Sequence, residues 1–392
     1  MELMPGYKHS DIGVIPKDWE VCTLAELCLK ITDGTHDTPT PVRSGVPFLT
    51  AIHIKENFID YENCLHLTAE DHRLIFARCN PERGDVLMVN IGAGVATTAL
   101  VDVDFEFSLK NVALLKPNAL LASGEYLNQC LIKRKPSITQ VLSSGGAQPF
   151  LSLSQIGQIR AAVPSIFEQQ NISEALSDAD ALLATLDQMI AKKRDLKQAA
   201  MQQLLTGKTR LPGFNGEWEE KALGEIATIS KGVQLHSSET DPDGHIPHYN
   251  GGMQPSSFTA RYNTPANTIA ISEGGNSCGF VQFITEPFWC GGHCYSVVPK
   301  SVDNGFLFHA LKGQQSAIMG LRVGSGLPNV QKTALGLFKL KFPKDSIEQT
   351  AIADVLSDMD TELSDLERRR EKTRALKQAM MHELLTGKTR LV

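Results

Sequence analysis

The chain carries the same eight residues twice. LLTGKTRL occupies positions 204–211 and returns at positions 384–391. Other segments also correspond between the two halves: 196–201 with 376–381, 176–180 with 356–360, Glu168-Gln169 with Glu348-Gln349, and Trp19-Glu20 with Trp218-Glu219. Similar segments in the same order in both halves indicate that one structural unit is repeated. We therefore predict two halves, each with a globular domain followed by the same helix.

The segments before the octapeptide are predicted to be two long helices. Neither 167–206 nor 347–386 contains Gly or Pro, and at 1.5 Å per residue each helix would be roughly 60 Å long. Apolar residues recur at steps of four and three, which is typical of a coiled-coil seam. The seam residues are Ile172, Leu176, Leu183, Leu186, Ile352, Leu356, Leu363 and Leu366. Matched length and register favour antiparallel pairing over the alternative, in which each helix packs on its own domain.

The Gly-Lys-Thr within the octapeptide resembles the end of a phosphate-binding loop. Such a loop carries another glycine five residues earlier, follows a strand and begins a helix. Here Gln202 and His382 hold that earlier position, and the motif ends a helix. Gly207 and Gly387 stand where a left-handed glycine ends a helix, so we interpret the motif as a helix stop.

The globular halves are predicted to be rich in strands. Short apolar or β-branched runs bounded by turn residues indicate strands, here at 86–91, 112–115, 268–271 and 295–298. Short helices are expected at 125–132 and 304–312. The predicted fold class is α+β, with two strand-rich α/β domains joined by two long antiparallel helices in a pseudo-twofold internal repeat. The expected bounds are 1–165 for the first domain, 166–207 for the central helix, 208–343 for the second domain, and 344–392 for the C-terminal helix with a short tail.

Composition and motifs exclude several classes of protein. There is no apolar run of about 18 residues and no signal-peptide pattern at the start, so we expect a cytoplasmic protein with no membrane contact. Cys290, His293 and Cys294 could bind zinc, but they lack the second close pair of ligands that a tetrahedral site needs, and no metal is expected. Phosphate-loop, GxSxG, HExxH and Asn-Pro-Pro-aromatic motifs are missing from the sequence. A binding scaffold is therefore favoured over an enzyme.

Short segments in a fixed order, with counterparts in the two halves, resemble one known family. They are Ile15-Pro-Lys-Asp-Trp19-Glu20, Asp33-Gly-Thr-His-Asp-Thr-Pro39, Val46-Pro-Phe-Leu49, Gly84-Asp-Val-Leu87, Pro164 leading to Glu168-Gln169, Glu217-Trp218-Glu219, His248-Tyr-Asn-Gly-Gly252 and Ile347-Glu-Gln349. Over essentially its whole length the chain resembles the specificity (S) subunit of type I restriction-modification systems.

The resemblance implies two target recognition domains, each reading one half of a gapped, asymmetric site in double-stranded DNA, with the paired helices fixing the gap. It also implies that two methyltransferase (M) subunits dock on the helices and that restriction (R) subunits join them. S-adenosylmethionine, ATP and Mg would be bound by those partners, so no cofactor and no catalytic residue are expected on this chain. The net charge of −6 predicts weak DNA binding by the chain alone, because DNA binding relies on cationic side chains.

Base reading needs polar side chains on loops that reach the major groove. The Gly/Ser/Asn-rich connections supply such candidates, although each could also be a turn residue that satisfies its own backbone. The candidates in the first half are Thr35, His36, Arg43, Lys55, Asn90, Lys110 and Gln148, and those in the second half are Lys231, His236, Asn250, Asn276, Arg322, Asn329 and Gln331.

Two other functions stay open from the sequence. A cytosolic coiled-coil adaptor with two protein-binding heads would keep the helices but lack a basic, polar-lined face on its domains. A self-sufficient DNA methyltransferase would need the base-holding motif that the sequence lacks.

Overall fold

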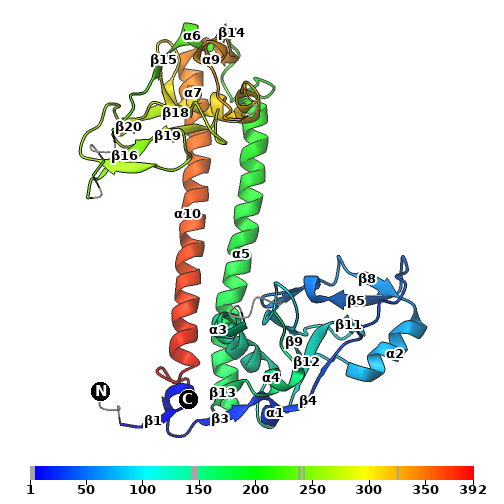
Figure 1. Cartoon of the computed structure of the whole chain (residues 1–392). Coiled ribbons are helices and arrows are strands. Elements are labelled where there is room, and N and C mark those ends of the chain that lie inside the picture. The colour runs from blue at the N-terminus through cyan, green and yellow to red at the C-terminus, as the bar shows by residue number, and fades with distance from the viewer. Residues whose placement is uncertain (1–4, 143–148, 237–239, 242, 325) are drawn as a thin grey trace. The chain divides into compact units, whose positions relative to one another are not determined.

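The computed structural model of the protein describes residues 5–142, 149–236, 240–241, 243–324 and 326–392. The chain forms two compact units, one made of Met1–Thr185 with Arg370–Val392 and the other of Leu186–Arg369. Helices α5 (Ile166–Leu204) and α10 (Ser346–Leu384) each contribute a segment to both units (Figure 1). The two long predicted helices are therefore confirmed. In the part of the chain that the structure describes, no helix has the length and apolar character to span a bilayer.

The first unit holds a mixed domain of strands and short helices. Its strands are β1 (Tyr7–Ser10), β2 (Gly13–Pro16), β3 (Glu20–Thr23), β4 (Cys28–Asp33), β5 (Val46–Thr50), β6 (Ile54–Lys55), β7 (Phe58–Ile59), β8 (Leu65–Leu67), β9 (Val86–Val89), β10 (Thr98–Leu100), β11 (Ser108–Lys110), β12 (Val112–Pro117) and β13 (Arg160–Val163). Its helices before α5 are α1 (Leu24–Leu27), the 3-10 turn η1 (Ala51–His53), α2 (Ala69–Cys79), α3 (Gly124–Leu142) and α4 (Leu153–Gly157).

The second unit is built in the same way. Its strands are β14 (Trp218–Ala222), β15 (Ala227–Lys231), β16 (Ile246–Tyr249), β17 (Ser257–Thr259), β18 (Thr268–Ser272), β19 (Val281–Ile284), β20 (Trp289–Cys290), β21 (Cys294–Pro299) and β22 (Lys339–Pro343). Its short helices are α6 (Leu223–Ile226), α7 (Asn304–Gly313), α8 (Gln315–Met319) and α9 (Lys332–Gly336).

The order of strands within the sheets is the same in the two units. The central sheet β10-β9-β12-β4 corresponds to β19-β18-β21-β15, and the second sheet β11-β5-β8 corresponds to β20-β16-β17. In each second sheet a parallel pair, β11 with β5 or β20 with β16, adjoins an antiparallel pair. The four strands predicted from apolar runs are β9, β12, β18 and β21. The internal repeat therefore extends through the globular domains, although their loops share little sequence.

Helix α3 is longer than predicted. The expected helix covered 125–132, whereas α3 continues past Pro136 to Leu142. Ile138 and Leu142 pack against the first core, and such tertiary contacts stabilise a helix beyond the point where a proline weakens it.

The long helices complete the core of each unit. Ile172 and Leu176 of α5 are buried in the first core together with Met381 and Leu384 of α10. In the second core, Ile352 and Leu356 of α10 are buried with Leu204 of α5. The first turns of each seam thus pack on the globular domain and on the end of the other helix. From the sequence, pairing of the helices with each other and packing of each helix on its own domain are alternatives. The structure contains both kinds of packing.

Polar contacts between α5 and the C-terminal segment run antiparallel in each unit. In the first unit Lys377 Nζ lies 2.5 Å from Asp180 Oδ1, and Asn171 Nδ2 donates to the Leu391 carbonyl. In the second unit Lys197 pairs with Asp360, and Lys193 with Glu362. Further along the seam Leu186 and Leu363 are buried, whereas Leu183 and Leu366 are half-buried.

The octapeptide does end each helix with a left-handed glycine, since Gly207 and Gly387 both have φ +68°. The close approach of the glycine to the N-terminal segment adds a second constraint. A Cβ added at Gly387 would lie 2.4 Å from Pro16 Cγ, and one at Gly207 would lie 3.3 Å from the ring of Trp218.

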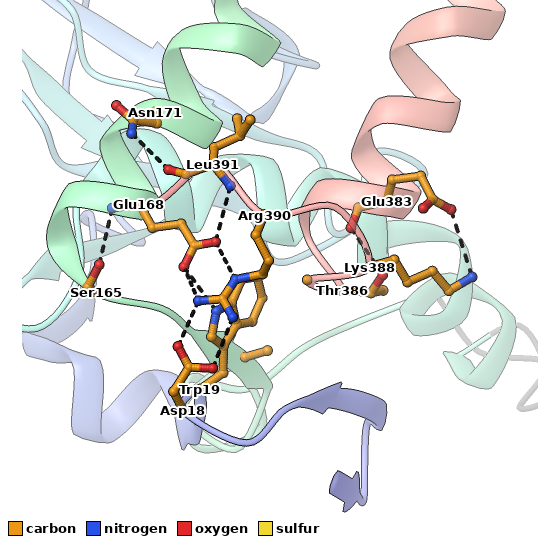
Figure 2. Close-up of polar contacts among 12 residues, drawn as sticks. Asp18, Trp19, Ser165, Glu168, Asn171, Glu383, Thr386, Lys388, Arg390 and Leu391 are labelled. Atoms are coloured by element: carbon orange, nitrogen blue, oxygen red, sulfur yellow. Dashed lines mark hydrogen bonds and ion pairs between the residues drawn. The ribbon is translucent and has the colours of Figure 1, made fainter. Parts of the chain in front are cut away.

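The arginine of the second octapeptide forms a cluster of contacts that we call the Arg390 clasp (Asp18, Trp19, Glu168, Arg390), drawn in Figure 2. Its guanidinium binds both oxygens of Glu168, at 2.6 and 2.8 Å, and both oxygens of Asp18, at 3.0 and 2.7 Å. The same group lies over the Trp19 ring at 5.6 Å, and Trp19 Nε1 donates to Glu168 Oε2. Arg390 thereby holds the pKa of Asp18 below its usual range, and the two carboxylates raise the pKa of Arg390.

The first octapeptide makes the equivalent contacts in the second unit. Arg210 binds both oxygens of Glu348 at 2.5 Å and lies over Trp218 at 5.7 Å. Glu168 and Glu348 are both essentially inaccessible to solvent. Each copy of the octapeptide therefore ends a long helix and supplies an arginine that neutralises a buried carboxylate.

Candidate nucleic-acid interface

Polar residues of the first domain gather at one edge of its central sheet. Strand β12 is antiparallel to both β4 and β9, so that Asp33 lies opposite Ala113 and Val89 lies opposite Val112. The ends of β4 and β9 and the start of β12 therefore meet, together with the loops attached to them. We call this the first reading edge, defined by Asp33, Thr35, His36, Asn90 and Lys110.

Three predicted residues contact their neighbours at the first reading edge. Thr35 forms a bridge with Lys110, and the Lys110 ammonium donates to Thr38. His36 Nδ1 lies 2.8 Å from Asn111 Oδ1, and its Nε2 lies 3.2 Å from Asp33 Oδ2. His36 is thus exposed and Lys110 half-buried on a short, hydrogen-bonded frame.

Asn90 also belongs to the first reading edge, because it directly follows β9. Its side chain is only 4% exposed. Its backbone carbonyl accepts from Leu151 N at 2.8 Å, which ties the edge to the segment after the glycine-rich loop.

Among the described residues, no contact brings Arg43 or Lys55 to this edge. Arg43 is exposed on a loop next to Val42, which bridges His66. Lys55 lies in the β6–β7 hairpin, where Asn57 donates to Asp180 of α5, so that this hairpin faces the long helix. Gln148 lies outside the described residues.

The equivalent edge of the second domain encloses a cavity. We call it the second reading edge, defined by Lys231, Asn250, Glu273, His293 and Asn329, which all line a pocket of about 470 Å³. Three of these residues, Lys231, Asn250 and Asn329, are sequence candidates. Asn250 Oδ1 accepts from His293 N at 3.0 Å, and Asn329 bridges Gly274.

A carboxylate organises the second reading edge. Glu273 Oε1 lies 2.7 Å from Lys231 Nζ and 3.0 Å from Tyr295 Oη. Burial and the neighbouring Glu273 raise the pKa of the Tyr295 phenol, so this group stays a neutral donor. Its Oη also lies 3.1 Å from the Val330 carbonyl.

The remaining candidates of the second domain lie on loops around this edge. Asn276 and Arg322 are exposed, and Arg322 precedes Val323, which bridges Asn329. His236 is exposed on the loop after β15. Gln331 precedes α9, and its side chain forms no cap on that helix.

The Cys290–Cys294 segment lies inside the second domain. Both thiols are buried, and the pKa of Cys294 is raised by its contact with Cys290 and by burial. Among the described residues there is no group of three or more potential ligands that could hold a metal ion.

Sequence reasoning missed three residues of the two edges as DNA candidates, Asp33, Glu273 and His293. It also missed Asn111 and Tyr295, which contact edge residues. Glu273 could have been found from the repeat, because it occupies the position in the second domain that Asn90 occupies in the first. That correspondence requires the strand register, which the divergent loops conceal.

Comparison with known families gives one domain that matches twice. The family described as "Type I restriction modification DNA specificity domain" matches residues 16–193 and 215–375. Each match contains one reading edge and most of one long helix.

Individual proteins give the same result. A protein of Mycoplasma pneumoniae assigned as a type I specificity subunit is 33% identical over 185 residues, which is 46% of this chain and 49% of that protein. The chain thus matches about half the length of this relative. A protein of Methanocaldococcus jannaschii assigned as the specificity subunit of the type I restriction enzyme MjaX is 26% identical over 98% of this chain and 97% of its own.

A solved structure shows the same fold. The crystal structure of a type I restriction-modification S subunit from M. genitalium superposes with a TM-score of 0.72 at 19% identity, covering 97% of this chain and 99% of that one. The arrangement of two domains with two long helices is therefore shared over nearly the whole chain.

Proposed function

Since the chain belongs to the type I restriction-modification DNA specificity family, we propose that it is the DNA-recognition subunit of such a system. Each globular domain would read one half of a gapped, asymmetric site in double-stranded DNA. The observation that carries this proposal is the pair of reading edges, which share one backbone frame and differ in their polar side chains.

The composition of the edges suits DNA. Lys110 and His36 on the first edge, and Lys231 and His293 on the second, offer donors for phosphate oxygens or base edges. Asn250 and Asn329 offer amides, which can pair with a base through a donor and an acceptor at once. Because the two domains present different polar side chains on the same backbone arrangement, they would recognise two different half-sites.

The rest of the proposed complex follows from the family. Two M subunits would dock on this chain and methylate adenine with S-adenosylmethionine, and R subunits using ATP and Mg would join them in the cytoplasm. This chain would carry no catalytic step. With a net charge of −6, it would depend on its partners for much of the cationic surface that holds DNA.

Methylation of the host genome tests the proposed function. When the chain is co-expressed with the M subunit of its own operon, we expect adenine methylation confined to one gapped, two-part sequence. Long-read sequencing detects that modification, and deleting this chain should abolish it. An unmodified genome in the presence of a folded complex would argue for the adaptor function instead.

Two equivalent grooves beside the long helices support the docking of two M subunits. The groove of the first unit lies between α3, α5 and α10 and has a volume of about 830 Å³, and that of the second lies between α5, α7, α8 and α10 and has about 670 Å³. Each is lined by the same residues of the repeat: Arg374, Lys377, Gln378 and Met381 in the first, and Arg194, Lys197, Gln198 and Met201 in the second. Two like grooves rimmed with cations fit two copies of one partner segment that carries acidic residues.

Filling one groove should remove one M subunit. Gln198 and Gln378 are exposed, so Gln198→Trp and Gln378→Trp place a large ring in a groove without breaking an ion pair between the helices. We expect each variant to change the stoichiometry from two M subunits per chain to one, and the double variant to bind none, measured by native mass spectrometry. Lys192→Trp, at an exposed position of α5 outside the groove lining, is the control and should keep both. Retention of two M subunits by the double variant would place the docking site elsewhere.

A further inference from the structure

Asn90 and Glu273 occupy the same position in the two domains. Each is the residue directly after the equivalent strand, β9 or β18. The carbonyl of each accepts at 2.8 Å from a main-chain N–H of the equivalent loop, Leu151 or Val330. The glycine two residues later, Gly92 or Gly275, has a left-handed φ of +90° or +79°. The main chain is thus held alike, while the side chain is an amide in one domain and a carboxylate in the other.

Each residue extends an apolar row that ends at its reading edge. Side chains alternate along a strand, so residues two apart share a face. Val86 and Met88 precede Asn90 in the first core, and Ile269 and Ile271 precede Glu273 in the second. A polar side chain at the end of such a row adds no apolar packing to the core. Its position therefore favours a role in binding at the reading edge.

Each side chain has an oxygen that lacks a hydrogen-bond donor among the described residues. In Asn90, which is 4% exposed, this atom is Oδ1, and in Glu273 it is Oε2. His293 Nδ1 lies 3.8 Å from Glu273 Oε2, beyond hydrogen-bond distance. A buried oxygen that accepts no hydrogen bond destabilises the folded protein. A ligand that donates an N–H group to this oxygen would remove that cost.

We propose, on the basis of the proposed function, that Asn90 and Glu273 are specificity-determining residues that each contact one base of their half-site. Glu273 accepts a hydrogen bond from the exocyclic amino group of a cytosine that reaches the second reading edge. Asn90 pairs its amide with the edge of an adenine at the first. A carboxylate suits the cytosine amino group, and an amide matches the donor and acceptor of adenine.

The competing reading is that Glu273 only supports the fold through Lys231 and Tyr295. Tyr295→Phe distinguishes this structural role from base contact. It removes the hydrogen bond from the phenol to Glu273 Oε1 and leaves Oε2 of the carboxylate able to accept from a base. Glu273→Gln keeps the shape and removes the charge, so it changes both the base contact and the support.

The experiment compares methylation profiles of the whole complex carrying wild-type chain, Glu273→Gln, Asn90→Asp or Tyr295→Phe. For Glu273→Gln we expect the preference for cytosine at one position of one half-site to fall by about tenfold to a hundredfold, the range for loss of one base contact. For Asn90→Asp we expect an altered preference at one position of the other half-site. Tyr295→Phe should keep both half-sites.

The outcomes separate this inference from the function on which it rests. A wild-type complex that modifies no gapped site would defeat both. A wild-type gapped site that stays unchanged in Glu273→Gln and Asn90→Asp would overturn the inference alone. Uniformly reduced methylation in both Glu273→Gln and Tyr295→Phe, with no change in base preference, would also overturn it. If Glu273→Gln does not fold, Asn90→Asp decides the matter by the same criterion at the other half-site.

Discussion

Replacing Arg390 with alanine should destabilise the first unit by about 3 kcal/mol, the lower part of the range for breaking a buried ion pair. The reason is Glu168, which is 1% exposed and binds the guanidinium through both oxygens. Without Arg390 its charge stays buried, and among the described residues the Trp19 indole and the Leu391 main-chain N–H remain as its donors. Urea unfolding followed by tryptophan fluorescence at neutral pH measures the loss.

Two control variants define the origin of this loss. Lys388→Ala removes an exposed cation of the same tail and should change stability by less than about 0.5 kcal/mol. The double variant Arg390→Ala/Glu168→Gln should be more stable than Arg390→Ala alone, because the amide removes the uncompensated charge. A double variant no more stable than the single one would show that the Arg390 clasp acts through packing on Trp19.

The choice of pH matters for this comparison. The hydrogen bonds from Arg390 lower the pKa of Asp18, so this carboxylate contributes stability at pH values above its unfolded pKa of about 4. That contribution is lost as the pH falls through the lower folded value. Measurements near pH 7 therefore include it in full.

The parts of the fold that depend on neighbours in sequence could be predicted. The two helices follow from long segments without Gly or Pro, and Gly207 and Gly387 mark their ends. The four central strands follow from apolar runs. These signals act within a few residues, so one sequence suffices to detect them.

The parts that depend on distant pairing could not be predicted. The sequence indicates only that the octapeptide is a helix stop, because the partner of Arg390 is Glu168, 222 residues away. Local sequence gives no sign that an arginine after a helix neutralises a buried carboxylate at the start of another. The exact repeat of the arginine was the only hint that it does more than end the helix.

The residues of the candidate site could likewise be predicted only in part, because their grouping depends on the pairing of distant strands. The sequence identifies Thr35, Lys110, Asn250 and Asn329 only as polar loop residues. The structure places Thr35 and Lys110 at the first reading edge and Asn250 and Asn329 at the second. Lys55 is also a polar residue of a predicted loop, but it lies in the β6–β7 hairpin, away from the contacts of the first reading edge. Glu273 was missed because carboxylates are scarce among expected DNA contacts, and only the strand register equates it with Asn90.

A longer pair of helices should give a longer gap between the half-sites. The change is an insertion of seven helix-forming residues into α5 between Thr185 and Leu186, matched by seven in α10 between Arg369 and Arg370. Seven residues preserve the heptad register, and both points lie at the boundary of the two units. The ion pairs Lys377–Asp180 and Lys197–Asp360 each stay within their own unit.

The matched insertion lengthens each helix by about 10 Å, which corresponds to up to about three base pairs at 3.4 Å each. We therefore expect methylation at a gapped site with both half-sites unchanged and the unread gap longer by one to three base pairs, read from the methylated genome. An insertion in α5 alone shifts the seam against α10, so it should abolish methylation. Altered half-sites with an unchanged gap would mean that the helices do not set the spacing. In that case the proposed M subunits would have to fix the distance between the half-sites.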